Sequence, residues 1–531
     1  MEVRRVLAKR GLAVGAAAVA AVGGAALHPG AARAAATCAR DGSGWTLSTS
    51  TYDTKYTRHP YVGNGYLSQR VPPAGMGYMA TGEKTGWPLY TPRYDGAFIS
   101  GLYGADPAIE EGRTIDAAIP TWSTLEVTVG SDTFSPTTPA SQISNFNQSV
   151  YLGCGLVRTS LTWTPAAGRA TDLTYDVLVD QASRRVGAVH VAVVPRWTGR
   201  VTVTDRIDGA GARRLVQTGG GAVAGTPTTI DVRFATQTLG TAGSVASTLV
   251  PPSGLNGASA TVSPSAKDLS ATDALSFPVR AGTTYELTKF VGADTALTSS
   301  DPAASAVSAS RDAAAKGWNG ILAEHTGAWG DLWRSDIQIS GQSELQSWVR
   351  SNLYALWSSI RQGSDTSISP VGLSSDNYAG LIFWDAETWM YPSLLLMHPD
   401  VAESVVEYRR KTLPGALTNA TQLGYNGSFF PWNGAGTGDL NQECHSWNPP
   451  HCITQIHLQG DIALSVWQYY LATGDVAWLR SHWSLLRNIA QFWASRVTAN
   501  RDGSYSIQNV AGPDEYSNGV NDGVFTNAGA A

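Results

Sequence analysis

Apolar and polar residues alternate with a period of two from Trp45 to Gly292, a stretch rich in Thr, Val, Gly and Ser. The clearest runs are TSLTWTP, TDLTYDVLVD, AVHVAVVPRW, VTVTDRID, TTIDVRFATQT and TYELTKFVG. Successive side chains of a strand point to opposite faces, so each run can bury one face and expose the other. With Gly, Pro and Asp turns between the runs, the pattern predicts a large antiparallel β-sandwich over residues 37–300.

The pattern changes near residue 300 to one that is typical of helices. Residues 301–340 place Trp318, Ile321 and Trp329 at helical spacing, which predicts a linker helix that leaves the sandwich. Residues 341–531 are expected to form a helical domain, with one short strand in GSYSIQNV. The expected helices cover residues 342–362, 385–397, 401–423, 460–473 and 476–497.

The first 36 residues resemble an export signal. Arg4 and Arg5 precede a weakly apolar Ala/Gly/Val run, and Ala34, Ala35 and Ala36 supply a small-residue cleavage site. The twin arginine suggests the Tat route and a secreted protein. An N-terminal membrane anchor is the alternative, but the run is short, poor in Leu and broken at Pro29.

The 531 residues are enough for two or three domains. A hydrophobic content of 43% and a charged content of 15% fit a globular protein. The formal net charge of -5 argues against nucleic acid or an anionic membrane as a partner.

Four cysteines are compatible with an oxidising compartment. Cys444 and Cys452 have a spacing that a loop disulfide could close, and Cys38 could pair with Cys154. Together with His445 and His451, Cys444 and Cys452 could instead form a zinc site, although the spacing does not match common zinc motifs.

Thirteen of the 18 tryptophans lie between Trp318 and Trp493. Indole rings pack helix cores and also stack on the apolar faces of sugars. Six tryptophans in the middle of expected helices are assigned to the core: Trp348, Trp357, Trp467, Trp478, Trp483 and Trp493. Trp384 and Trp432 stand beside loops with polar neighbours, so they are expected to line a pocket.

The motif FWDAETWMYP gathers Trp384, Asp385 and Glu387 at the start of a helix. Asp385 could simply cap that helix. Carboxylates beside an indole also suit a pocket that binds sugar hydroxyls and stacks on a sugar ring. His457, Gln459 and Asp461 begin another expected helix, which places several loops at one end of the helical domain, where pockets form.

The loop GPDEYSNGVNDGVFTN, Gly512 to Asn527, carries the adjacent acids Asp514 and Glu515. Adjacent side chains point in different directions, so one acid can face a pocket while the other holds the loop. A glycosidase needs a carboxylic acid that protonates the leaving oxygen. A surface turn would explain the same residues.

Five segments together resemble the ordered motifs of glycoside hydrolase family 65. They are GNGYLSQR, FWDAETWMYP, EYRRKTLPGAL, IHLQGDIALSVWQYYLATGD and GPDEYSNGVNDGVFTNA. The family contains acid trehalases, kojibiose hydrolase-like α-glucosidases, and maltose, trehalose and kojibiose phosphorylases. The resemblance implies an N-terminal β-sandwich, a helical linker and an (α/α)6 barrel that acts by inversion on α-glucosidic disaccharides.

By the same resemblance Glu515 is the general acid. Trp384 and Asp385 bind the glucose that is cleaved, with Glu387, Trp432 and Asp514 nearby. Neither a cofactor nor a metal is implied. The family's general base and phosphate site follow the GPDEY motif, so this sequence is expected to hold about the first half of the barrel and to lack the base.

A secreted, trehalase-like inverting hydrolase is the expected function, with an α-linked glucose disaccharide as substrate. A disaccharide phosphorylase and an inactive sugar-binding fragment are the alternatives. The preferred linkage and the oligomeric state are left open by the sequence.

Overall fold

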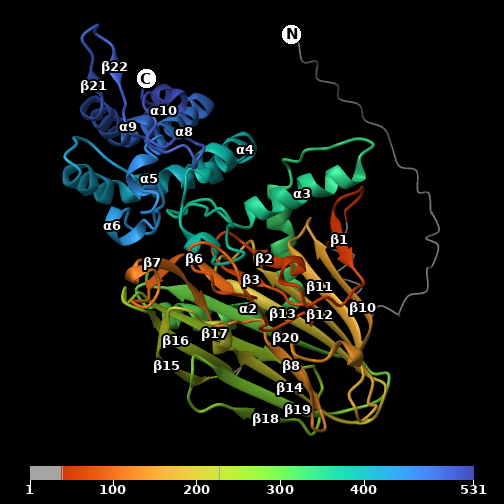
Figure 1. Ribbon diagram of the computed structural model, residues 1–531. Coiled ribbons are helices and arrows are strands. Elements are labelled where there is room, and N and C mark those ends of the chain that lie inside the picture. The colour runs from red at the N-terminus through yellow and green to blue at the C-terminus, as the bar shows by residue number, and fades with distance from the viewer. Residues whose placement is uncertain (1–37, 39, 226–227) are drawn as a thin grey trace.

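A computed structural model of the chain describes residues 38, 40–225 and 228–531. The expected export signal, residues 1–36, lies outside the described residues. Figure 1 shows a β-domain formed by the first part of the chain and a group of helices formed by the last part, with α3 beside the boundary between them. This order agrees with the division into a β-sandwich and a helical region.

A nine-stranded antiparallel sheet is the larger layer of the β-domain. Its strands, in spatial order, are β1 (Thr46–Thr49), β10 (Ile143–Tyr151), β11 (Leu156–Trp163), β12 (Thr171–Val179), β13 (Val186–Pro195), β20 (Tyr285–Thr295), β17 (Ala242–Val250), β16 (Thr229–Thr236) and β15 (Leu215–Val223). The register pairs Leu161 with Leu173 and Tyr175 with Val191, so the buried side chains of neighbouring strands face the same core.

A five-stranded sheet is the second layer and shares that core. Its order is β18 (Ser259–Val262), β19 (Ala271–Val279), β14 (Gly199–Ile207), β8 (Leu125–Val129) and β9 (Asp132–Phe134). Phe134, Val203 and Phe277 from this sheet pack in one cluster with Val191 and Phe234 from the larger sheet. The β-sandwich predicted from the period-two alternation is therefore confirmed.

Short strand pairs lie outside the two layers. They are β2 (Tyr61–Gly63) with β3 (Ser68–Arg70), β4 (Ala80–Lys84) with β5 (Pro92–Tyr94), β6 (Ala97–Ala105) with β7 (Thr114–Ile119), and β21 (Thr498–Ala499) with β22 (Tyr505–Ser506). The last pair contains the short strand expected in GSYSIQNV.

Helix α2 (Pro302–Leu332) packs on β20 and β17 of the nine-stranded sheet. Trp318, Ile321 and Leu322 form a buried cluster with Phe290 of β20. The expectation that this helix leaves the sandwich was wrong. Its apolar stripe covers the outer face of the sheet, because a sheet with apolar residues on both faces must be covered on both.

The remaining helices are α3 (Ser343–Trp357), α4 (Tyr391–Met397), α5 (Pro399–Gln422), α6 (Leu440–Glu443), α7 (His451–Thr454), α8 (Leu458–Thr473), α9 (Val476–Arg496) and α10 (Val524–Ala530). All five expected helices are present, with two corrections. The helix expected to reach residue 362 ends at Trp357, and the one expected from residue 385 begins as a π-helix, Ala386–Met390, before α4.

The tryptophans assigned to the core divide into two groups. Trp357, Trp478 and Trp493 are buried as expected. The assignment was wrong for three others, because Trp348, Trp467 and Trp483 are 60%, 43% and 55% exposed. Position within a helix does not fix which face a residue occupies.

The loop between α3 and α4 is anchored to the β-domain near its middle. Arg214 forms a buried ion pair with Asp376 at 3.0 Å, and the hydroxyl of Tyr94 donates to the same carboxylate oxygen at 2.9 Å. The hydroxyl of Tyr103 donates to the carbonyl of Gly380 at 2.9 Å. Gly380 has φ +64, and a Cβ there would lie 2.5 Å from Asp116, so the loop reaches the sheet only with glycine at this position.

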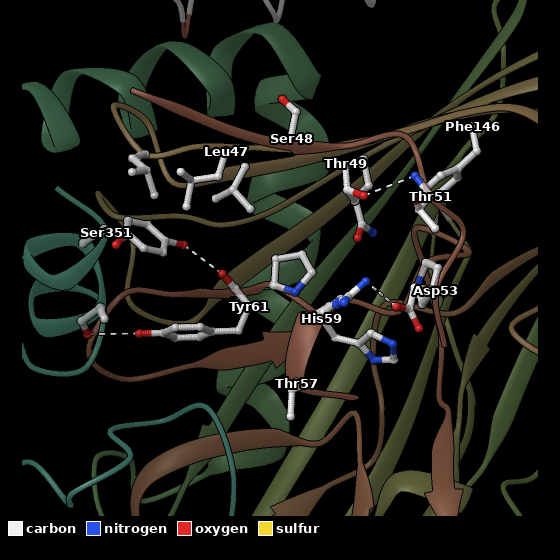
Figure 2. Close-up of a pocket in the computed structure, with 18 residues that line it drawn as sticks. Leu47, Ser48, Thr49, Thr51, Asp53, Thr57, His59, Tyr61, Phe146 and Ser351 are labelled. Atoms are coloured by element: carbon white, nitrogen blue, oxygen red, sulfur yellow. Dashed lines mark hydrogen bonds and ion pairs between the residues drawn. The ribbon is translucent and has the colours of Figure 1, made fainter. Parts of the chain in front are cut away.

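A cavity of about 390 Å³ separates the sheet edge at β1 and β10 from α3 (Figure 2). Leu47, Phe146 and Tyr354 contribute apolar surface to it. The hydroxyl of Tyr354 donates to the Tyr61 carbonyl at 2.9 Å, and that of Tyr61 donates to the Ala355 carbonyl at 3.0 Å. These bonds join α3 to the β-domain beside the cavity.

Both disulfides expected from the sequence are present. Cys38 pairs with Cys154, at a sequence separation of 116, and Cys444 pairs with Cys452, at a separation of 8. Cys38 and Cys154 join the buried cluster beneath α2. The first bridge therefore links the start of the described chain to the β-domain, and the second closes a local loop in the helical region.

The two disulfides are expected to differ in their effect on stability. In the chain-entropy model the longer loop restricts the unfolded chain more, by about 5 kcal/mol against about 2.5 kcal/mol for the short loop. Cys38→Ser/Cys154→Ser should therefore lower the midpoint of urea unfolding more than Cys444→Ser/Cys452→Ser. Equal losses would show that native contacts of the short loop outweigh chain entropy.

Candidate active site

Two loops of the helical region place indole rings side by side. The amide of Ile382 donates to the Gly434 carbonyl at 2.8 Å, and that of Gly434 donates back at 3.1 Å. This short bridge brings Trp384 and Trp432 to a ring separation of 6.3 Å. Trp432 is buried, whereas Trp384 is half-buried and presents part of its ring outward.

The N-terminal end of α8 packs against these two rings through His457. The His457 ring lies 4.8 Å from Trp384 and 5.6 Å from Trp432. Its Nδ1 contacts the Asp461 carboxylate at 2.8 Å, one helical turn later. Gln459 binds both backbone groups of Phe430, at 2.9 Å and 2.8 Å, and so fixes the loop that carries Trp432.

Glu443 holds the other end of that loop. Its buried carboxylate accepts backbone hydrogen bonds from Ala435, Thr437 and Gly438 at 2.6, 2.6 and 2.8 Å. Burial raises the pKa of this carboxyl, and the hydrogen bonds oppose the effect. A fully hydrogen-bonded buried carboxylate has a structural role here.

Asp385 follows Trp384 and is half-buried. It occupies the N-cap position of the π-helix, but its side chain makes no cap hydrogen bond, so the capping alternative is not what the structure shows. Burial raises its pKa, and the charge of Glu515 raises it further. The two carboxylates therefore lie within electrostatic range of each other.

The loop with Asp514 and Glu515 is fastened by its backbone. Nε2 of His451 donates to the Glu515 carbonyl at 3.1 Å. The Asp514 carboxylate accepts hydrogen bonds from the Tyr516 amide at 3.2 Å and the Ser517 hydroxyl at 2.7 Å. Asp514 thus holds the turn, while the exposed Glu515 carboxylate forms no hydrogen bond or ion pair with the described part of the chain.

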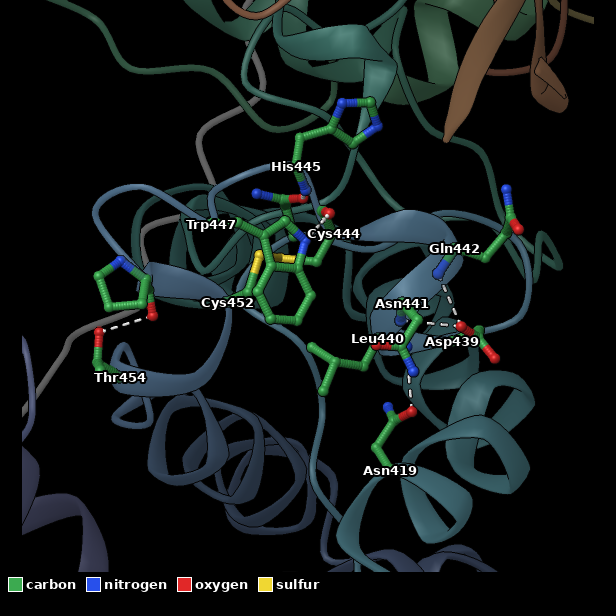
Figure 3. Close-up of a disulfide and its surroundings, with 12 residues drawn as sticks. Asn419, Asp439, Leu440, Asn441, Gln442, Cys444, His445, Trp447, Cys452 and Thr454 are labelled. Carbon is green, nitrogen blue, oxygen red and sulfur yellow. Dashed lines mark hydrogen bonds between the residues drawn. A yellow bond between two sulfur atoms is a disulfide. The ribbon is translucent and has the colours of Figure 1, made fainter. Parts of the chain in front are cut away.

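Figure 3 shows the second disulfide, between Cys444 and Cys452, which adjoins in the sequence the histidine that holds this loop. His451 directly precedes Cys452, and Nε1 of Trp447 donates to the Cys444 carbonyl at 2.8 Å. His445 points to a different partner, the Thr114 carbonyl of β7, at 2.8 Å. Because both sulfurs are in the disulfide and the histidines face different partners, the zinc alternative was wrong.

Glu387 does not line the surface beside Trp384. Its carboxylate is buried and forms a two-pronged ion pair with Arg409 of α5, at 2.7 Å and 3.0 Å. Burial raises the pKa of Glu387, and Arg409 opposes the rise. The ion pair contacts the FWD motif, because Nη2 of Arg409 also donates a hydrogen bond to the Phe383 carbonyl at 3.5 Å.

Two residues of this region, Arg409 and Phe525, were not singled out from the sequence, and His451 was considered there only as a zinc ligand. Arg409 neutralises Glu387, His451 holds the Glu515 backbone, and Phe525 of α10 lies 6.0 Å from the Trp384 ring and 5.2 Å from the His457 ring. For Arg409 a signal existed, because it occupies the apolar stripe of α5 formed by Val405, Val406 and Leu413. A charge in such a stripe indicates a buried partner.

An aromatic wall beside two carboxylates defines a class of site. The rings of Trp384, Trp432 and Phe525 supply apolar surface, and Asp385 and Glu515 supply hydrogen-bond acceptors or a proton. Sugars present both an apolar ring face and hydroxyls, so this combination is typical of a carbohydrate-binding site.

Two family models match the chain. "Glycosyl hydrolase family 65, N-terminal domain" matches residues 47–332, and "Glycosyl hydrolase family 65 central catalytic domain" matches residues 350–531. The chain therefore belongs to glycoside hydrolase family 65, as the motifs indicated.

Curated relatives agree with this membership. The chain is 39% identical over 256 residues to a kojibiose hydrolase from Flavobacterium johnsoniae, covering 48% of this chain and 37% of that protein. It is 30% identical over 545 residues to a periplasmic/secreted acid trehalase from Candida glabrata, covering 90% of this chain and 43% of that protein. The chain thus spans less than half the length of these relatives.

A solved structure shows the same fold. It is described as "Putative kojibiose phosphorylase from human microbiome", and it matches with a TM-score of 0.77 at 17% identity, over 92% of this chain and 64% of that chain. At this identity the match establishes a large β-domain followed by a helical region.

We expect the Arg409–Glu387 pair to be essential for stability. Arg409→Met leaves a buried carboxylate without its partner, which should cost about 3–5 kcal/mol of unfolding free energy. The double variant Arg409→Met/Glu387→Gln should lose less. Arg410→Met is the matched control, because Arg410 is 53% exposed beside Glu407 and should cost about 1 kcal/mol or less. A small loss in Arg409→Met, measured by urea unfolding, would contradict the assigned role.

Asp385→Asn should raise the melting temperature near neutral pH, because it removes a half-buried charge close to Glu515. Since the folded-state pKa of Asp385 is raised, the native state binds more protons than the unfolded state, and stability falls as pH rises through that pKa. The gain from asparagine should therefore shrink in acid. Thermal unfolding over a pH series tests this, with the exposed Asp41→Asn as control. An unchanged melting temperature near neutral pH would contradict the destabilising effect assigned to the Asp385 charge.

Proposed function

We propose that this protein is an inverting glycoside hydrolase acting on α-glucosidic disaccharides, trehalose foremost, with Glu515 as general acid. One observation carries the proposal. The Glu515 carboxylate forms no hydrogen bond or ion pair in the described chain, and its charge acts on Asp385, the residue that follows the Trp384 indole. A general acid must be free to approach the glycosidic oxygen, and the Glu515 carboxylate has no partner in the described chain that would hold it back.

The other residues receive separate roles. Trp384 stacks on the glucose ring and Asp385 accepts hydrogen bonds from its hydroxyls. Trp432 backs Trp384, and Asp514 holds the turn that presents Glu515. Glu387 acts indirectly, because its pair with Arg409 supports the segment that carries Trp384 and Asp385.

An inverting mechanism needs a second carboxylate about 6.5–9.5 Å from the acid, with room for the attacking water. We propose that the helices α3 to α10 belong to an (α/α)6 barrel. The family resemblance supports a base that follows Glu515 in the barrel. The kojibiose hydrolase and acid trehalase relatives are longer than this chain, which is compatible with that position.

We propose that the protein acts outside the cell. The twin-arginine segment before residue 37 supports export, and the trehalase relative from Candida glabrata is described as periplasmic/secreted. The described residues include no helix long and apolar enough to cross a membrane. Export favours hydrolysis over phosphorolysis, because a sugar phosphate product is useful mainly inside the cell.

Glucose release tests the reaction. The chain, with any residues that its gene encodes after Ala531, should be assayed on trehalose, kojibiose, nigerose and maltose, with and without phosphate. We expect release without phosphate, and trehalose as a substrate. A requirement for phosphate with formation of glucose 1-phosphate would establish a phosphorylase instead. Binding of disaccharide without turnover would establish a sugar-binding protein.

Glu515→Gln tests the acid. The variant should fold normally and lose about 10²–10⁴ in kcat, because the amide cannot donate the proton. Glu344→Gln, which changes an exposed glutamate on α3, is the control and should retain full activity. Near-normal turnover by Glu515→Gln would exclude Glu515 as the acid. Turnover of a substrate with an activated leaving group such as fluoride should survive the substitution, because that group leaves without being protonated.

A further inference from the structure

A second, smaller cavity lies where the β-domain meets the loop that follows α3. Its volume is about 60 Å³. Arg184, from the turn between β12 and β13, faces it from the β-domain, and Arg361 and Lys411 face it from the helical region. It shares no residue with the Trp384 and Glu515 site.

Neither Arg184 nor Arg361 has an ion-pair partner in the part of the chain that the structure describes, although the charge of Asp180 acts on Arg361. Arg361 donates one hydrogen bond, from Nη1 to the Asn64 carbonyl at 3.2 Å, and Arg184 lies 5.5 Å from the Tyr66 ring. No carboxylate of the described chain forms an ion pair with either guanidinium. Burial and, to a smaller extent, the charge of Arg184 lower the pKa of Arg361 to about 10, while the charge of Asp180 opposes the shift. Two guanidinium groups therefore repel each other at this cavity.

Nearby carboxylates are already engaged. Asp365 lines the cavity and pairs with Lys411 at 3.1 Å. Asp294 pairs with Arg185 at 2.6 Å and accepts the Tyr66 hydroxyl at 2.7 Å. Asp180 accepts the amides of Ala182 and Ser183 within its own turn. With one carboxylate and three cations, the cavity lining keeps an excess of positive charge.

Hydroxyl groups complete the wall. Ser100 and Ser364 each lie 2.6 Å from the Thr366 hydroxyl. Three hydroxyls carry three protons, and the two contacts among them use two. One proton is left to donate to a group in the cavity.

We propose that this cavity binds a free tetrahedral oxyanion, inorganic phosphate or sulfate, between Arg184 and Arg361. Guanidinium groups match the geometry of such anions and form strong charge-assisted hydrogen bonds with them. The volume is enough for about four water molecules, which suits a small ion and is far below the roughly 300 Å³ of a typical organic-ligand pocket. Because Arg184 and Arg361 belong to different domains, the ion would join the two.

The motif GNGYLSQR builds one side of this junction. Asn64 accepts the Arg361 bond, and a Cβ on Gly65 would lie 2.3 Å from the Ile360 carbonyl carbon. Gly65 has φ +78, so glycine is required both by the backbone conformation and by the close approach. This motif therefore positions Arg361 and does not contact the Trp384 and Glu515 site.

Calorimetric titration with inorganic phosphate, and separately with sulfate, tests the proposal directly. Binding at one site per chain is expected, and the melting temperature should rise with the logarithm of the anion concentration at constant ionic strength. Arg184→Gln should raise Kd at least about tenfold, because one charge-assisted hydrogen bond is lost. This variant should fold, since Arg184 donates no hydrogen bond to the described chain.

Arg487→Gln, an exposed residue of α9, carries the same charge change and should leave Kd unaltered. Equal phosphate affinity in the wild type and Arg184→Gln would overturn the proposal, as would the absence of binding to the wild type. Glucose 1-phosphate separates the two sources of a phosphate group. Tighter binding of the sugar phosphate than of the free ion, with competition by trehalose, would place the anion in the sugar site and also overturn it.

The outcome does not depend on the proposed hydrolase activity. A failure of glucose release in all substrates would leave the phosphate titration unchanged, and a failure of anion binding would leave Glu515 untouched. Phosphate bound at Arg184 should not be consumed, so no glucose 1-phosphate should form at this site.

Discussion

The buried ion pair between Arg214 and Asp376 anchors the loop on which both proposed sites depend. The loop begins after Trp357 at the end of α3 and continues to Trp384. Its first part, with Arg361, lines the anion cavity and its last part forms the sugar site. The β-domain contacts it midway through Arg214, Tyr94 and Tyr103. Removing water from the Arg214 and Asp376 charges costs free energy. The attraction between the two charges offsets this cost only when their geometry is well defined. The β-sandwich therefore positions the helical site without contributing a residue to it.

The acids with a structural role differ from the proposed functional acids in their hydrogen-bond and ion-pair partners. Glu387 is neutralised by Arg409, and Glu443 accepts three backbone amides. Asp385 has no cap hydrogen bond, and the Glu515 carboxylate has no partner in the described chain. A buried group needs partners to offset desolvation, whereas a group that acts on a ligand must keep its hydrogen-bonding capacity free. Types and spacing of residues alone could not make this distinction for Glu387.

Much of the fold could be predicted because it depends on local periodicity. The alternating strand β14 and the largely apolar strand β13 were found, and so were the long helices α5 and α9. Errors arose where tertiary packing decides. Trp348 lies on an exposed helix face, and α2 folds back onto the sheet instead of leaving it. The two disulfides could be proposed from spacing and compartment, but the contact of His451 with Glu515 joins residues 64 positions apart, which no local pattern encodes.

The anchored loop also limits what an anion at Arg361 could do to the sugar site. Coupling between two sites requires an element with two arrangements that both ligands bias. Asp376 and Gly380 lie between Arg361 and Trp384, and both are held by buried contacts to the β-domain. A close-packed segment of this kind transmits little displacement unless the contacts break. The anion should therefore stabilise the domain junction while leaving the affinity of the Trp384 site for sugar unchanged.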